Sequence, residues 1–240
     1  MRGRFDELVA AAWPAHYTER LAGWRLRYAA GVTKRANSVL PLGDPGEPRA
    51  AIEGAESFYA ARGLPTVFSI GDGAWPGLDD VLGARGYEVV DPTLVMTLDL
   101  ADRPAPPITG AHFAASIDDV PSSEWLDLWW SVDGRYSGGL DAATRILTGV
   151  PASYVRLGAG QAVGRGVAQG EWYGIYCMAV APGARRRGLG RAVLRTLLAR
   201  ARLRGARRAY LVVVERNAPA RRLYEREGFQ VAGRYHYRVR

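Results

Sequence analysis

The 240-residue sequence has few of the residues that certain chemistries require. Its one cysteine, Cys177, excludes an internal disulfide framework and a zinc site built from several thiolates. Its three histidines, His16, His112 and His236, match no metal-ligand spacing. No segment reaches the roughly 18 consecutive apolar residues of a membrane helix, and the N-terminal residues lack the apolar core of a signal peptide. We therefore expect a cytoplasmic protein with no metal and no membrane partner.

Basic residues are unevenly distributed along the chain. Lys34 is the only lysine, whereas 17 arginines face three acidic residues from Arg185 to Arg240. This segment carries a net charge of +14, and the 184 residues before it carry −6. Concentrated positive charge suits nucleic acid, an anionic surface or a phosphorylated cofactor. Nucleic-acid binding ranks last of these, because the segment has no helix-turn-helix, zinc-finger or RNA-binding signature.

Hydrophobic patterning predicts a mixed α/β fold in two parts. Residues 101–112 contain three prolines and are the best linker candidate, so we place a boundary between residues 1–104 and 105–240. After the linker, the patterning predicts an alternation of strands and helices. The predicted strands are 112–117, 153–158, 161–170, 172–182, 209–214 and 230–240. The predicted helices are 120–132, 191–205 and 217–229.

The first hundred residues resemble the last sixty at an offset of 142. Gly63 and Gly86 lie 23 residues apart, as do Gly205 and Gly228, and the predicted helix at 49–63 aligns with the helix at 191–205. These matches favour a duplicated fold. Where the second copy has "RRRGLG", the first has "GDPGEP", so we interpret the first copy as degenerate.

The turn "RRRGLG" (185–190) follows an apolar strand and opens an apolar-striped helix. The first amides of a helix have no intrahelical acceptor and lie at the positive end of the helix dipole. Glycines let such a backbone approach a phosphate closely. The turn does not fit a dinucleotide fingerprint, because Val193 stands where a third small residue is needed, and it lacks the Gly-Lys-Ser/Thr of a nucleotide-triphosphate loop.

Two motifs resemble those of the GNAT N-acetyltransferases. "VAPGARRRGLGRAVL" (180–194) is similar to the acetyl-coenzyme A signature R/Q-x-x-G-x-G/A after a strand ending V-x-P. "NAPARRLYEREGF" (217–229) is similar to the second block, N-x-x-A-x-x-x-Y-x-x-x-G-F. Both blocks occur in the family's order over residues 110–240. The resemblance implies a GNAT fold. Together with the internal repeat, it implies a layout similar to that of tandem actinobacterial GNAT enzymes.

The resemblance also implies roles for individual residues. The backbone amides of the turn would hold the coenzyme A pyrophosphate, and the strand edge would pair with the pantetheine arm. The Met178 amide would stabilise the thioester oxyanion, Asn217 would bind the pantetheine, and Tyr224 would protonate the leaving thiolate. Asn217 also suits a plain helix N-cap, and Tyr224 a core position. The implied cofactor-binding residues are Met178, Ala179, Val180, Arg185, Arg186, Arg187, Gly188, Leu189, Gly190, Arg191, Asn217 and Tyr224.

The general base and the acceptor are less determined. Many GNAT relatives have a glutamate where this sequence has Gly174, so Glu171 is the candidate base, with an exposed turn residue as the alternative. Cys177 has no histidine at a recognisable spacing, and we reject covalent catalysis. Aromatic and acidic residues are expected to wall the acceptor side and to suit an amine of apolar or cationic character. These residues are Trp125, Trp129, Trp130, Asp133, Tyr136, Asp141, Trp172 and Tyr173.

We therefore expect an acetyl-coenzyme A-dependent N-acetyltransferase that acts on a primary amine of a small molecule or peptide by direct attack on the thioester. The alternative is a GNAT-like module that binds acyl-coenzyme A without catalysis. A monomer and a homodimer both remain open.

Overall fold

The computed structural model describes residues 3–101, 115–134 and 139–240. Its strands form one 11-stranded mixed sheet in the order β1-β2-β3-β4-β11-β5-β10-β9-β8-β7-β6. The strands are β1 (Tyr17–Leu21), β2 (Trp24–Tyr28), β3 (Val39–Leu40), β4 (Val67–Ile70), β5 (Glu88–Asp99), β6 (Ala115–Asp118), β7 (Ser153–Leu157), β8 (Ala162–Gln169), β9 (Trp172–Val180), β10 (Arg208–Val214) and β11 (Gln230–Val239). The helices are α1 (Arg4–Ala12), α2 (Pro48–Ala60), α3 (Leu78–Ala84), α4 (Ser123–Asp133), α5 (Gly139–Thr148), α6 (Leu189–Leu203) and α7 (Ala218–Arg226). The 3-10 turns are η1 (Lys34–Ala36) and η2 (Pro182–Ala184).

The predicted mixed α/β fold is confirmed, and most elements after the linker lie where the patterning placed them. The linker candidate and the boundary at 104/105 lie mostly or wholly outside the described residues. After the linker one helix was missed. This is α5, whose apolar residues recur at helical spacing and are buried, namely Ala142, Ala143, Ile146 and Leu147.

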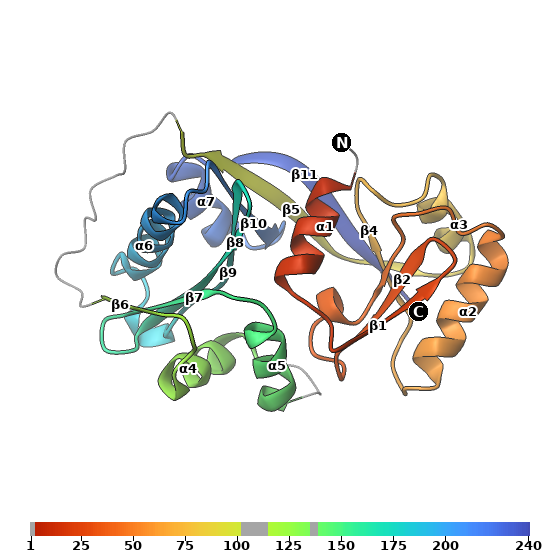
Figure 1. The fold of residues 1–240 in the computed structure, drawn as a ribbon, viewed down its shortest axis with the longest axis horizontal. Helices are drawn as coiled ribbons and strands as arrows, with labels where there is room; N and C mark the ends of the chain where they lie inside the picture. Colours follow the sequence, from red (N-terminus) through yellow and green to blue (C-terminus); the bar gives the residue numbers. More distant parts are fainter. Residues whose placement is uncertain (1–2, 102–114, 135–138) are drawn as a thin grey trace.

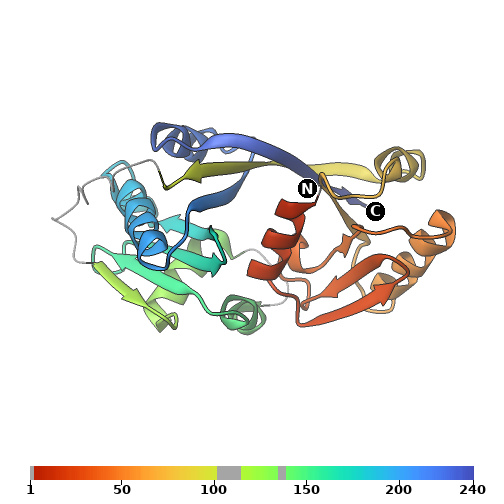
Figure 2. The same cartoon turned by 45° about the horizontal axis from the view of Figure 1, so that its top comes forward.

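The two halves of the chain exchange their last strands. β5, from the first hundred residues, pairs antiparallel with β10, from Thr93 opposite Val214 to Asp99 opposite Arg208. β11, which ends the chain, pairs antiparallel with β4. β5 and β11 also pair with each other, and Figure 2 shows them running as one long ribbon across both halves. Each half of the sheet is therefore completed by a strand from the other.

Helices cover the two faces of the second half differently. α6 packs over β7, β8 and β9 on one face, in a cluster of buried aliphatic residues. α4 and α5 pack on the opposite face, in a cluster that includes Trp125 and Trp129. α1 joins this second cluster and lies at the centre of the molecule, between the two halves (Figure 1). The first half thus supplies part of the cover over the second half's sheet.

α6 follows from its local sequence. Gly188 adopts a left-handed φ of 83° directly before the helix begins at Leu189, a conformation that glycine adopts without strain. The apolar stripe of the helix is buried, namely Val193, Leu194, Leu197, Leu198 and Ala201. Within the described residues, no helix is long and apolar enough to cross a membrane.

The strand exchange predicts that the halves depend on each other. Residues 105–240 alone lack β5, so β10 would expose an unpaired strand edge, and residues 1–104 alone lack β11 beside β4. We expect each fragment, produced separately, to show no cooperative thermal transition by circular dichroism, and the mixed fragments to recover one. The full chain is the control. A cooperative transition in either fragment alone would show that the exchanged strand is dispensable.

Candidate active site

The site begins where two parallel strands separate. β9 pairs with β10 only from Trp172 opposite Arg208 to Ile175 opposite Leu211. After Ile175, β9 stays paired with β8 on its other side but not with β10. The backbone groups of residues 176–180 that point towards β10 therefore have no strand partner in the described chain.

A β-bulge lies in β9 where the strands separate. Ala179 pairs with Val163 and Tyr176 with Arg165, so Cys177 and Met178 together lie opposite Gly164. Cys177 takes a φ of 54°, which costs of order 1–3 kcal/mol for a residue other than glycine. Such bulges bend a strand and re-aim its groups, and they are frequent beside active sites.

Gly164 allows close packing behind the bulge. A Cβ at this position would lie 2.6 Å from Cγ1 of Val193 on α6 and 3.1 Å from the Met178 sulfur. Gly164 lies inside β8 and not at a turn. Its role is to let α6 approach the sheet.

The separated strands enclose a cavity of about 480 Å³, called here the β9–β10 cavity. Residues 175–178 of β9 and 212–214 of β10 form its two walls. Three residues implied by the GNAT resemblance line it from the helical side, namely Arg185, Asn217 and Tyr224. The structure therefore brings Met178, Asn217 and Tyr224 together around one opening.

The "RRRGLG" turn forms the N-terminus of α6 as expected. Arg185, Arg186 and Arg187 are exposed, and Arg185 Nε donates to the Val180 carbonyl over 3.4 Å. The first amides of α6, including those of Leu189 and Gly190, have no acceptor within the helix. The exposed arginines and the free amides make the turn suitable for binding an anionic ligand such as a diphosphate.

The Arg191 side chain does not join that group. It donates to the Glu227 carboxylate, which Arg195 also binds over 2.8 Å. Burial raises the pKa of Glu227, but the hydrogen bonds from Arg195 and Arg191 hold it below its usual value. The Arg191 side chain thus links α6 to the end of α7. Only the backbone amide of Arg191 remains a candidate to bind the ligand.

Asn217 and Tyr224 keep both of the roles that the sequence allowed. Asn217 Oδ1 accepts from the Ala220 amide over 3.3 Å as the N-cap of α7, and the residue also lines the cavity. Tyr224 is buried against Phe229, with ring centroids 6.1 Å apart. Burial raises the pKa of Tyr224 to about 12, so the phenol keeps its proton at neutral pH and can donate it.

Glu171 lies away from the cavity. It sits at the turn between β8 and β9, its side chain is 62% exposed, and it lies 3.8 Å from Arg207. At about 3.3 Å per strand residue, the bulge is well beyond its reach. This placement matches the exposed-turn alternative, and we do not retain Glu171 as the base.

The expected acceptor wall is only partly present. Trp125 and Trp129 are core residues, each 1% exposed, and Tyr173 belongs to the aliphatic core on the α6 face. Trp172 packs edge-on against Phe5 and does not line the cavity. Of the eight expected residues, Asp133 lines the β9–β10 cavity and Tyr136 lies outside the described residues.

The first half supplies walls that sequence reasoning missed. Trp13, Thr33, Lys34 and Arg35 line the cavity beside the bulge. Their loop is held by the buried Asn37 side chain, which accepts from the amides of residues 29 and 31 and donates to the carbonyls of residues 32 and 33. No motif marks this loop, because its place depends on contacts with distant strands.

A family model described as "Probable histone acetyltransferase Rv0428c C-terminal" matches residues 4–238. The chain belongs to this family of GNAT N-acetyltransferases. The chain is 31% identical over 242 residues to "Uncharacterized N-acetyltransferase YobR" of Bacillus subtilis, covering 99% of this chain and 98% of that protein. It is 29% identical to "Probable histone acetyltransferase Rv0428c" of Mycobacterium tuberculosis, covering 87% of this chain and 64% of that protein.

Solved structures confirm the GNAT fold. A GCN5-related N-acetyltransferase from Kribbella flavida has a TM-score of 0.75 and 18% identity, with 100% of this chain and 95% of that chain covered. A tandem GNAT protein from the clavulanic acid biosynthesis pathway has a TM-score of 0.64 and 14% identity, with 98% and 86% covered. At these identities the likeness concerns the fold alone.

The Cys177 thiol is expected to react slowly. Burial raises its pKa to about 12, so little thiolate exists at neutral pH. We expect the native chain to react with iodoacetamide at pH 8 at least about 100-fold more slowly than the denatured chain. Labelling followed by mass spectrometry measures both rates. Comparable rates would mean that the thiol is activated and would reopen a nucleophilic role.

Proposed function

We propose that this GNAT enzyme transfers an acetyl group from acetyl-coenzyme A to a primary amine of a small molecule or peptide by direct attack on the thioester. The observation that carries the proposal is the opening between β9 and β10. The strand edge, the bulge, the Tyr224 phenol and Arg185 of the turn before α6 all line it.

The residues present fit acetyl-coenzyme A as a co-substrate. The α6 turn would hold its diphosphate through the amides from Arg186 to Arg191, with the exposed arginines adding attraction. The edge of β9 from Met178 through Ala179 to Val180 would pair with the pantetheine arm as an added strand. Bound in this way, the co-substrate supplies an activated acetyl thioester beside the bulge.

At the bulge, the Met178 amide is the proposed oxyanion donor. A fixed donor aimed at the developing charge contributes about 10²–10³ in rate. Tyr224 is the proposed acid for the leaving thiolate, since its raised pKa keeps it protonated. Holding amine and thioester in one cavity supplies further rate by proximity.

The attacking amine must lose a proton, and the structure offers a different base from Glu171. Of the described carboxylates, Asp91 and Asp133 line the β9–β10 cavity. Asp91 is held by Lys34 at 3.1 Å and by Arg216 at 2.7 Å. Asp133 lies near enough to the bulge to add to the effect of burial in raising the pKa of the Cys177 thiol. We therefore propose Asp133 as the base, directly or through water.

We also propose that the first half is a degenerate copy that binds no coenzyme A. The offset of 142 places β4 on β10 and β5 on β11, which supports duplication. β3, the short strand parallel to β4, pairs through Val39 with Phe68 inside β4. β3 ends at Leu40, so within residues 3–101 no unpaired strand run comparable to residues 176–180 of β9 follows it.

Tyr224→Phe tests the acid. We expect kcat to fall by about 10²–10⁴-fold while the acetyl-coenzyme A dissociation constant stays unchanged, because the hydroxyl acts only on the leaving thiolate. Thiol release in an amine panel gives the rate and calorimetry gives the binding. Tyr17→Phe, on the exposed β1, is the control. Uptake of acetyl-coenzyme A with no turnover by the wild type would support the non-catalytic module instead.

Asp133→Asn tests the base. At neutral pH we expect kcat/KM to fall by roughly 10²-fold or more, because the amine then reacts only as its own free base. The loss should shrink as pH rises towards the amine's pKa. Asp127→Asn, on the exposed face of α4, is the matched control. A pH–rate profile for Asp133→Asn that overlays the wild type would remove Asp133 from the mechanism.

A further inference from the structure

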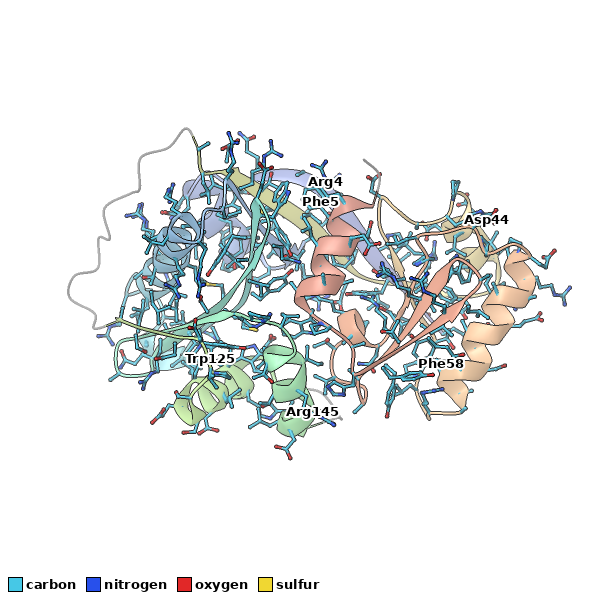
Figure 3. All side chains as sticks on the ribbon, in the orientation of Figure 1. Arg4, Phe5, Asp44, Phe58, Trp125 and Arg145 are labelled. Atoms are coloured by element: carbon cyan, nitrogen blue, oxygen red, sulfur yellow. The ribbon has the colours of Figure 1, made fainter. Side chains whose placement is uncertain are left out.

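A second cavity, of about 660 Å³, lies beneath α1 and is called here the α1 cavity. α1 forms one wall, and β4, β5 and β11 with the ends of β2 and β3 form the others. Phe5, near the start of α1 in Figure 3, lines it together with Val9, Ile70 and Val95. Apolar residues therefore form part of its wall, beside charged residues that include Asp6 and Arg27.

The two cavities meet at three shared residues. Arg35, Tyr235 and Tyr237 line both the α1 cavity and the β9–β10 cavity. Four residues proposed to hold acetyl-coenzyme A line the β9–β10 cavity, and none of them lines the α1 cavity. They are Met178, Arg185, Asn217 and Tyr224. The α1 cavity is thus available to the acceptor, and Arg35 stands at the junction.

Arg35 lies among aromatic rings. Its guanidinium carbon is 5.1 Å from the Trp13 ring centroid and 5.6 Å from that of Tyr176. Tyr176 is the residue directly before Cys177 of the bulge, and its hydroxyl is 2.7 Å from that of Tyr210. Arg35 is therefore next to the place where the acetyl group would react.

The charge of Arg35 is not balanced by a carboxylate of the described chain. No ion pair among the described residues includes it, and its buried Nε has no hydrogen-bond partner among them. The neighbouring Lys34 differs, because it pairs with Asp91 at 3.1 Å. The half-buried Arg35 does share a side-chain hydrogen bond with Tyr235. A phenol that keeps its proton at neutral pH brings no formal negative charge, so a ligand anion would still be stabilised beside Arg35.

We propose that the acceptor is an amine that also carries a carboxylate, with Arg35 binding the carboxylate and the α1 cavity taking an apolar body. A guanidinium binds a planar carboxylate through two parallel hydrogen bonds, which the free Nε–H allows. Apolar amino acids have this chemistry. The proposal rests on the acetyltransferase function above. It reverses the expectation of a mildly acidic cleft for apolar or cationic amines.

The first test uses the wild-type enzyme and matched acceptors. Apolar amino acids are compared with their amides and with the amines that lack the carboxylate. We expect kcat/KM to be at least about 30-fold higher for the acids. Amine basicity cannot produce a preference for the acids over the amides, because the amides have more free amine at neutral pH. The rates with the plain amines are compared after correction for their smaller fraction of free amine. Equal or better rates with the amides or plain amines would overturn the proposal and leave acetyl transfer intact.

The second test is Arg35→Gln, with Arg35→Lys as the variant that keeps the charge. We expect Arg35→Gln to raise KM for the acids by about 30-fold or more and to leave the plain amines and acetyl-coenzyme A binding unchanged. Arg62→Gln is the control, since Arg62 also stacks on an aromatic ring, Phe58 at 3.6 Å, but lines neither cavity. An equal loss for acids and plain amines would mean that Arg35 only supports the fold.

A binding measurement separates this inference from the proposed function. N-acetylated apolar amino acids and their amides are titrated calorimetrically into the wild type and Arg35→Gln without coenzyme A. We expect the acids alone to bind the wild type and to bind Arg35→Gln at least about tenfold more weakly. If the acids bind as expected but no acetyl transfer is detected, the proposed acetyltransferase function is refuted and the anion site at Arg35 is retained. Equal binding of acids and amides would refute the anion site.

Discussion

The loss of pairing between β9 and β10 after Ile175 and Leu211 is the feature on which the rest of the site depends. Two parallel strands that stayed paired would leave no room for a ligand and no free strand edge. The bulge at Cys177 and Met178 accompanies this separation, and the close approach of α6 at Gly164 packs behind it. The strained φ of Cys177 is thus associated with a site rather than with packing alone.

The exchange of β5 and β11 makes the site a product of both halves. β5 extends the sheet beside β10, and β11 carries Tyr235 and Tyr237 to the junction of the two cavities. The loop before β3 adds Lys34 and Arg35 from the other direction. We therefore propose that the half that lacks the "RRRGLG" turn takes part in substrate selection together with β11.

Local sequence was enough to predict the parts of the site that depend on local geometry. The turn before α6 and the Asn217 cap of α7 follow from glycine conformation and helix capping, and both lie where expected. Glu171 and Arg191 could not be placed, because one depends on where β9 meets its turn and the other on an ion pair with distant Glu227. Arg35 was missed for the same reason, since its surroundings come from β9, β11 and Trp13, the residue after α1.

A crystal structure of the complex with acetyl-coenzyme A tests the central claim most directly. The account predicts the diphosphate at the amides that begin α6, the pantetheine along residues 178–180 of β9, and the thioester carbonyl within hydrogen-bond distance of the Met178 amide. Coenzyme A bound elsewhere, or a β9 that closes against β10 beyond Ile175, would contradict it.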